Sequence, residues 1–241
     1  MAIAELRSVE KIYPLGKTQV HALKGVSLTV EKGAFVVVAG PSGSGKSTIL
    51  NLLGCIDTAT SGVVKVGGVN TGSLKDKQLT TLRHEVLGFI FQSFNLIPVL
   101  NVYENVEFPL LLGNNGTSRK ETRAWLEHLI EAVGLSEWRT HKPSELSGGH
   151  RQRVAIARAL ATKPGIILAD EPTANLDSVT SEAILGLMRQ MNRDLGTTFI
   201  FSTHDQDIVD LADHVIRLHD GVVVQDSKAE ATDLRTAEVS A

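Results

Sequence analysis

The fold of this 241-residue chain is indicated first by one stretch, Gly40-Pro41-Ser42-Gly43-Ser44-Gly45-Lys46-Ser47-Thr48. It follows the pattern G-x-x-x-x-G-K-[ST], in which glycines let a loop turn tightly between a strand and a helix. The flanking residues fit that context. Residues 34–39 form an apolar run typical of a buried strand, and residues 49–53 are compatible with a helix. The stretch, called here the glycine-rich loop, therefore predicts a strand–loop–helix unit of an α/β fold.

The same loop has the chemistry of a phosphate-binding site. Its glycines let backbone N–H groups point inward at phosphate oxygens, and the amino end of the following helix adds a positive dipole. Lys46 supplies a full charge to the β- and γ-phosphates, and Ser47 carries a hydroxyl suited to Mg2+. The alternative is a glycine-rich turn without a ligand. The strand and helix context favours phosphate, so we expect a nucleoside triphosphate bound with magnesium.

Two acids follow a second apolar run. Residues 166–169 lead directly into Asp170 and Glu171. If this run is a strand beside the first, Asp170 faces the phosphates and holds magnesium through its water shell. Glu171 is then placed to polarise the attacking water. Two solvated acids after a strand are the alternative, but beside a phosphate loop the pair predicts triphosphate hydrolysis.

Outward from these motifs the chain alternates strands and helices. Short β-branched runs predict strands at residues 6–13, 21–30, 63–66, 165–169, 197–202, 215–218 and 222–225, the last two as a hairpin across Asp220-Gly221. Helical periodicity predicts a helix over residues 118–133, opened by a Ser118/Glu121 capping box, and another over residues 178–195, stopped by Gly196.

These elements predict one α/β domain over residues 1–226. Its sheet is expected to be mostly parallel and buried on both faces, because the runs 34–39 and 166–169 are apolar throughout. The strand signal fades over residues 95–160, which predicts an inserted α-helical subdomain. Residues 227–241 are small, polar and aperiodic, and predict a flexible tail.

The composition limits the choice of partner and compartment. With 24 Lys plus Arg against 27 Asp plus Glu, the net charge is −3, so the strongly basic footprint of a nucleic-acid binder is missing and no nucleic-acid partner is expected. The single cysteine, Cys55, cannot close an intrachain disulfide. No apolar run approaches the roughly 18 residues of a spanning helix, and Glu5 and Arg7 interrupt any secretory signal. We therefore expect a cytoplasmic location.

A second helix amino end is suited to an anion. Ser147 is a natural N-cap, and Gly148 and Gly149 leave the end of the predicted helix bare. Nearby lie three arginines, Arg151, Arg153 and Arg158. Because one triphosphate does not need two cradles in one chain, the hypothesis is that this end completes the first site of another copy. A flexible N-cap with a solvated basic face is the alternative.

Five ordered motifs together resemble the nucleotide-binding subunit of ATP-binding cassette (ABC) transporters. They are the glycine-rich loop, Leu146-Ser-Gly-Gly, Asp170-Glu171, Ala174-Asn-Leu-Asp177 and Ser202-Thr-His204-Asp, and the resemblance covers residues 5–225. The stretches Asn51-Leu-Leu-Gly-Cys-Ile-Asp, Phe89-Ile-Phe-Gln-Ser-Phe-Asn-Leu-Ile-Pro and Glu104-Asn-Val-Glu-Phe-Pro-Leu resemble the bacterial lipoprotein-releasing and macrolide-export ATPase group. The resemblance implies a P-loop NTPase core with an antiparallel β subdomain, ATP and Mg2+ as ligands, a second copy as partner, and separate transmembrane permease subunits.

The resemblance also implies roles for single residues. Tyr13 matches the aromatic residue that stacks on adenine, Gln92 the glutamine that touches magnesium and the attacking water, and His204 the histidine that hydrogen-bonds the γ-phosphate. Residues 147–149 match the signature segment, which binds the γ-phosphate in the opposite subunit, and Asp177 matches the loop that crosses the dimer interface. From the residues alone, Tyr13 also fits a core tyrosine, Gln92 a surface amide and His204 a structural histidine.

One residue of the signature region departs from the family pattern. His150 stands where the family usually has glutamine. A glutamine three residues after Ser147 would complete a capping box, whereas histidine has less reach and cannot accept that bond when protonated. The departure predicts a retained but weaker or pH-sensitive signature function.

The leading hypothesis is an ATPase, peripheral on the cytoplasmic face of the inner (plasma) membrane, that powers lipoprotein release or macrolide-type export. One alternative is a soluble cassette protein acting on nucleic acid or ribosomes, and the chain lacks the heptads or second motif set expected there. The other alternative is a regulatory module that binds a nucleotide without hydrolysing it, and an intact Glu171 argues against that alternative.

Overall fold

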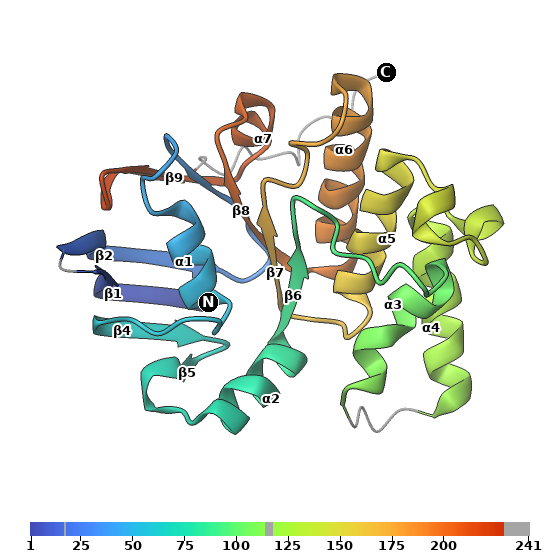
Figure 1. The fold of residues 1–241 in the computed structure, drawn as a ribbon, viewed down its shortest axis with the longest axis horizontal. Helices are drawn as coiled ribbons and strands as arrows, with labels where there is room; N and C mark the ends of the chain where they lie inside the picture. Colours follow the sequence, from blue (N-terminus) through green and yellow to red (C-terminus); the bar gives the residue numbers. More distant parts are fainter. Residues whose placement is uncertain (17, 114–117, 229–241) are drawn as a thin grey trace, which may run out of the picture.

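Two sheets form the body of the protein, and helices cover them (Figure 1). The computed structural model describes residues 1–16, 18–113 and 118–228. The larger sheet has the strand order β10-β9-β3-β8-β7-β6 and the smaller one β2-β1-β4-β5. The predicted α/β fold with a mostly parallel sheet, an antiparallel sheet and an inserted helical region is confirmed.

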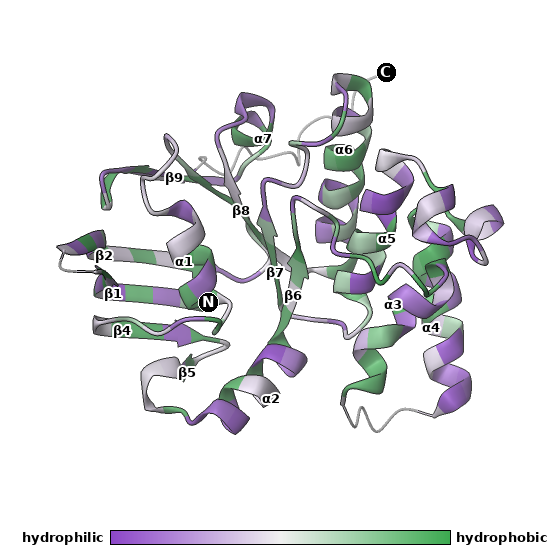
Figure 2. Cartoon of the chain, viewed as in Figure 1, coloured by the Kyte–Doolittle hydropathy of each residue, from purple (hydrophilic) through white to green (hydrophobic). Residues whose placement is uncertain are grey.

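The larger sheet is buried on both faces. Its strands are β6 (Leu87–Ile90), β7 (Ile166–Asp170), β8 (Thr198–Thr203), β3 (Phe35–Ala39), β9 (His214–His219) and β10 (Val222–Lys228), and only β10 runs antiparallel to its neighbour. Along β3, Phe35 and Val37 join the core on the helical side, while Val36 and Val38 join the core on the other side. A strand without polar alternation therefore marks the centre of the sheet. In Figure 2, β6 and β7 of the same sheet are drawn mostly in green, the hydrophobic colour.

The smaller sheet is antiparallel, and its first three strands are longer than the sequence predicted. It contains β1 (Ala2–Leu15), β2 (Thr18–Glu31), β4 (Ser61–Val66) and β5 (Val69–Asn70). The inward residues of β1, such as Leu6 and Val9, pack in one core with Ile49 and Leu53 of α1 (Lys46–Leu53). This packing fixes the helix that follows the glycine-rich loop.

The region between β6 and β7 is helical, as predicted. It contains α3 (Val102–Leu111), α4 (Arg119–Ala132), η2 (Ser136–Trp138), η3 (Pro143–Glu145) and α5 (Gly148–Leu160), with no strand among its described residues. The predicted capping box at α4 is confirmed, since Ser118 Oγ accepts from Glu121 N and Glu121 Oε2 accepts from Ser118 N. This helical lobe lies at the side of the sheet away from β1 and β2 (Figure 1).

The remaining elements include one confirmed helix and several that the sequence missed. The helix α6 (Ser178–Leu195) is confirmed and ends at Gly196, whose φ is 64°. The structure adds η1 (Thr71–Ser73), α2 (Asp76–Val86), α7 (Gln206–Asp210) and β6. The predicted hairpin at Asp220-Gly221 is confirmed, but β10 continues to Lys228 because Ser227 and Lys228 pair with β9. The rest of the predicted tail, residues 229–241, lies outside the described residues.

Candidate active site

The glycine-rich loop connects β3 to α1 through positions where a side chain does not fit. Gly40 has φ 154°, and a Cβ there would lie 2.3 Å from the carbonyl oxygen of Leu218. Gly45, the N-cap of α1, has φ 106° and would bring a Cβ to 2.7 Å from Ala22 O. The loop is therefore a bare backbone turn at the amino end of a helix, the arrangement that binds phosphate.

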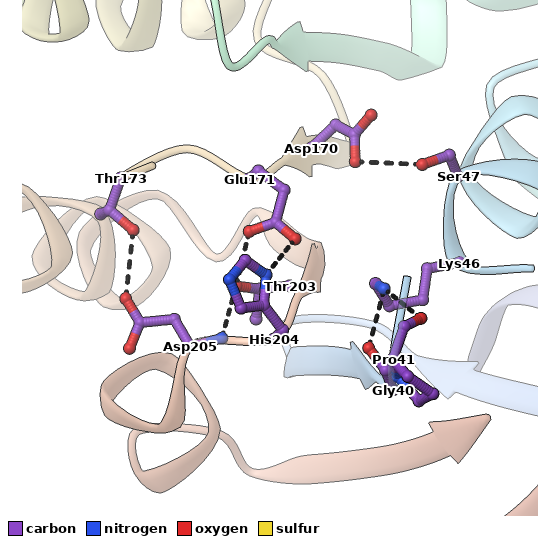
Figure 3. Close-up of polar contacts among 10 residues, drawn as sticks. All are labelled: Gly40, Pro41, Lys46, Ser47, Asp170, Glu171, Thr173, Thr203, His204 and Asp205. Carbon is purple, nitrogen blue, oxygen red and sulfur yellow. Dashed lines mark hydrogen bonds and ion pairs between the residues drawn. The ribbon is translucent and has the colours of Figure 1, made fainter. Parts of the chain in front are cut away.

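Lys46 lies inside this turn. Its side chain is buried, and Nζ donates to Gly40 O at 2.8 Å and to Pro41 O at 2.9 Å (Figure 3). Carbonyl groups hold the ammonium without neutralising it, and no carboxylate pairs with Lys46 in the described part of the chain. The hydroxyl of Ser44 is buried in the same loop without a hydrogen-bond partner. A fixed positive charge beside an unused donor suits an anionic ligand.

Ser47 and Asp170 bring a hydroxyl and a carboxylate together at the edge of this turn. Ser47 is the second residue of α1, Asp170 ends β7, and their Oγ and Oδ1 atoms are 3.5 Å apart (Figure 3). Oxygen donors of this kind, one of them charged, are what Mg2+ takes when substrate phosphates supply further ligands. The pair fits the magnesium site that the sequence predicted.

Glu171 is held in an unusual backbone conformation immediately after β7. Its φ is 45°, and its N–H donates to Ser202 O at 2.9 Å. The carboxylate accepts from Thr203 Oγ1 at 3.1 Å and lies 2.8 Å from His204 Nδ1 (Figure 3). A non-glycine residue at positive φ is uncommon and is found where surrounding structure enforces it, often at functional sites. Residues at the carboxyl ends of β7 and β8 thus meet at one carboxylate.

These side chains line one cavity of about 650 Å3. Its predicted members are Pro41, Ser42, Gly43, Gly45, Lys46, Ser47, Thr48, Gln92, Asp170, Glu171 and His204. Sequence reasoning missed the wall formed by Val20, His21 and Ala22 of β2, together with Ala174 and Ser202. Ser202 lies two residues before His204 and could have been found from that motif, whereas β2 carries no local signal for a site.

Gln92 lines the cavity, and its loop is tied to two other elements. Asn175 Nδ2 donates to Gln92 O at 2.9 Å. Arg158 of α5 donates to Phe94 O at 2.7 Å and to Asn95 O at 2.5 Å, in the turn that follows. Burial lowers the pKa of Arg158, and these carbonyls solvate its charge. The loop that carries Gln92 is therefore tied both to the segment after β7 and to α5.

Tyr13 does not line the cavity. Its hydroxyl donates to Asp57 Oδ2 at 2.7 Å, and Lys11 Nζ lies 4.7 Å from its ring centroid. Burial and the hydrogen bond to the carboxylate raise the pKa of this phenol. Its stacking on adenine stays a prediction.

The signature segment lies outside the cavity lining. Ser147 caps α5, its Oγ accepting from His150 N at 3.2 Å, and none of the described residues Ser147, Gly148 and Gly149 lines the cavity. The His150 ring packs on Trp138, with centroids 4.6 Å apart. The histidine thus makes a ring contact in place of the capping-box bond that glutamine would make.

Asp177 is the N-cap of α6, beside the signature segment. Its Oδ1 accepts from Thr180 N at 2.9 Å and its Oδ2 from Thr180 Oγ1 at 2.7 Å. The Thr180 backbone N–H, followed by the Thr180 hydroxyl, lowers the pKa of this carboxyl. A Cβ on Gly149 would lie 2.6 Å from Thr180 Cγ2, so the amino ends of α5 and α6 are in close contact.

Comparison with known proteins agrees with this geometry. Residues 23–174 match the family model described as ABC transporter. The chain belongs to the ABC transporter family. Like other ABC cassettes, it is an ATPase. No described helix of this ABC protein combines the length and the apolar character needed to cross a membrane.

Its relatives in the family match nearly the whole chain. It is 44% identical to the uncharacterised ABC transporter ATP-binding protein MJ0796 of Methanocaldococcus jannaschii, over 96% of this chain and 99% of the relative. It is 42% identical to the macrolide export ATP-binding/permease protein MacB of Rhodopirellula baltica, over 95% of this chain but only 33% of that protein. This chain therefore corresponds to about a third of MacB.

Solved ABC structures have the same fold. A dimeric, post-hydrolysis structure of the MJ0796 cassette bound to ADP and Pi aligns with a TM-score of 0.85, at 44% identity, covering 94% of this chain and 99% of that one. The cbiO1 protein of Clostridium perfringens, part of the ABC transporter complex cbiONQ, aligns with a TM-score of 0.84 at 29% identity, covering 94% of this chain and 88% of that one.

Proposed function

We propose that two copies of this chain close head to tail on two ATP molecules with Mg2+, hydrolyse them, and drive separate transmembrane permease subunits. The observation that carries the proposal is the single cavity that joins the glycine-rich loop to Asp170, Glu171 and His204. Charge-neutralising groups and a carboxylate next to one another are what phosphoryl transfer to water requires.

Each group has a proposed part in the reaction. The loop N–H groups and Lys46 hold the phosphates, Glu171 takes a proton from the attacking water, and His204 hydrogen-bonds the γ-phosphate. Ser47, Asp170 and Gln92 are the residues that would hold Mg2+, which when bound neutralises phosphate charge. The products are ADP and phosphate.

The place of the signature segment supports the proposed dimer. Residues 147–149 form a helix amino end with an exposed Ser147 and half-buried Gly148 and Gly149, and they line no part of their own cavity. The MJ0796 cassette, 44% identical, has a dimeric structure with ADP and Pi. In our proposal each copy places its signature segment on the γ-phosphate held by the other, and Asp177 crosses the same interface.

The permease is proposed to dock beside the Gln92 loop. A groove of about 300 Å3, mostly apolar, is lined there by Phe91, Ile97, Phe108 and Leu112 among others. The MacB relatives, whose names join ATP-binding and permease parts, favour macrolide-type export as the work done, with lipoprotein release as the second candidate. The chain would then act at the cytoplasmic face of the inner membrane.

The catalytic assignment is tested by separating binding from turnover. Lys46→Met should weaken ATP binding roughly tenfold or more, because a full charge on the phosphates is lost. Glu171→Gln should keep ATP binding within about threefold while kcat falls roughly 100-fold or more. Equilibrium titration with a fluorescent ATP analogue and a phosphate-release assay measure both. Glu182→Gln, an exposed carboxylate on α6, is the control. Normal turnover by Glu171→Gln would reject the assignment.

The docking groove can be tested with two adjacent leucines. Leu111 and Leu112 are 68% and 69% exposed, but only Leu112 lines the groove. Leu112→Glu should reduce co-sedimentation with inner-membrane vesicles from the source cells at least fivefold, and Leu111→Glu should not. Equal effects from the two substitutions would remove the groove from the proposal.

A further inference from the structure

Gln152, in the second turn of helix α5, contacts the chain beside Glu171. The side chain is fully buried, and its Nε2 donates to Pro172 O at 2.7 Å. Pro172 directly follows Glu171 and has no N–H, so its carbonyl is the polar backbone group through which residue 172 can be held.

Packing alone does not account for an amide at this position. A carbonyl can only accept, so the hydrogen bond to Pro172 fixes which end of the amide is the donor. Gln152 Oε1 then finds no hydrogen-bond partner among the described residues, although it is buried. Half of the amide is left unsatisfied, which is costly, whereas a methionine would fill a similar volume without that cost. The bond to Pro172 is what the amide provides.

With that bond, the backbone is held by hydrogen bonds on both sides of the strained residue, Glu171. Glu171 has φ 45°, its own N–H is held by Ser202 O, and the carbonyl of the next residue is held by Gln152. A conformation of this kind persists only when its surroundings enforce it. We infer that Gln152 is a positioning residue, which holds the backbone after Glu171 so that its carboxylate stays aimed into the cavity. The inference rests on the proposed role of Glu171.

The position of Gln152 also links two sites. It lies on the helix whose amino end, residues 147–149, is proposed to bind the γ-phosphate of the other copy. Closure on the partner's nucleotide is thereby connected, through one helix and one hydrogen bond, to the carboxylate of the chain's own site.

The test compares two buried amides that donate to backbone carbonyls. Gln152→Met removes the bond to Pro172 O. Asn192→Leu removes bonds to Gly33 O and Thr197 O, which precede β3 and β8 and so lie at the sheet edge away from the cavity. ATPase kinetics are measured below the unfolding midpoint of each variant. We expect Gln152→Met to lose at least tenfold in kcat, with KM for ATP within threefold. Asn192→Leu should keep kcat within twofold even where its midpoint falls. A kcat for Gln152→Met no lower than that of Asn192→Leu would overturn the inference.

A double-mutant cycle separates positioning from general loss of structure. If Gln152 acts through Glu171, then Gln152→Met lowers the residual turnover of Glu171→Gln by less than it lowers that of the unmodified chain. Equal fractional losses in both backgrounds would contradict this. Gln152→Asn, one methylene too short to reach Pro172 O, should reproduce the loss in kcat and replaces Gln152→Met if that variant does not fold. A wild-type rate for Glu171→Gln would instead refute the proposed function itself.

Discussion

Asp57 connects two side chains that belong to the antiparallel sheet. Its Oδ1 accepts from Lys11 Nζ at 2.6 Å and its Oδ2 from Tyr13 Oη at 2.7 Å. Burial alone would raise the pKa of this carboxyl, but the bonds from Lys11 and Tyr13 outweigh it and the pKa is lowered. The folded state therefore binds a proton less readily than the unfolded chain.

This carboxyl predicts a pH-dependent contribution to stability. A lowered pKa stabilises the fold above the unfolded value of about 3.9, and the contribution is lost as pH falls through the folded pKa. At pH 7, Asp57→Asn should lower the free energy of unfolding by about 1 kcal/mol, and the difference should shrink as pH falls below about 4. Urea unfolding at several pH values measures it, with exposed Asp194→Asn as control. A difference that does not change with pH would contradict the assignment.

At single positions, the sequence identified those residues whose chemistry is local. The glycine-rich loop, Asp170 and Glu171 are recognisable because each motif carries its own donors or charge. The role of Asp57 was missed because its partners, Lys11 and Tyr13, lie in β1, far away in the sequence. His21 was missed because only the fold brings β2 to the cavity. The contact of the Gln152 amide with Pro172, and the Oε1 atom that it leaves without a partner among the described residues, are likewise visible only in the structure.

Among the elements, α5 packs on β6 at one point of very close approach. A Cβ on Gly88 would lie 2.3 Å from Ala159 O, so the helix backbone rests directly on the strand. Gly88→Ala should therefore destabilise the protein by about 3 kcal/mol through overpacking. Gly186, inside α6, has no atom within 4 Å of such a Cβ, and Gly186→Ala should stabilise by about 0.5–1 kcal/mol. Denaturant unfolding of the two variants should give opposite signs; the same sign for both would refute this packing argument.

Elements were predictable where their ends carry chemistry of their own. The capping box of Ser118 and Glu121 marked the start of α4, and Gly196 marked the end of α6. The strand β6 has only four residues, too few for periodicity, and α2 buries only Leu79 and Leu82, so both were missed.

For the whole molecule, the sequence predicted the architecture and indicated residues 147–149 as the segment that meets another copy, but the residues that line the groove proposed for a permease come together only in the fold. The cavity and the signature segment are separate on one chain, since residues 147–149 line no part of the described cavity. The surface of a permease belongs to another chain, so its residues leave no pattern in this sequence. The proposed catalytic site is therefore built by two copies rather than one.

The site shared by two copies is tested by the light-scattering mass of Glu171→Gln with and without ATP and Mg2+. Because the substitution removes the proposed general base, it should trap the closed pair. We predict a monomer without nucleotide and a doubled mass with it. Adding Ser147→Glu should abolish the dimer by placing a negative charge against the partner's γ-phosphate, whereas Ser144→Glu, at an exposed serine nearby, should not. Glu171→Gln that binds ATP and stays monomeric, or a dimer that Ser147→Glu leaves intact, would contradict the composite site.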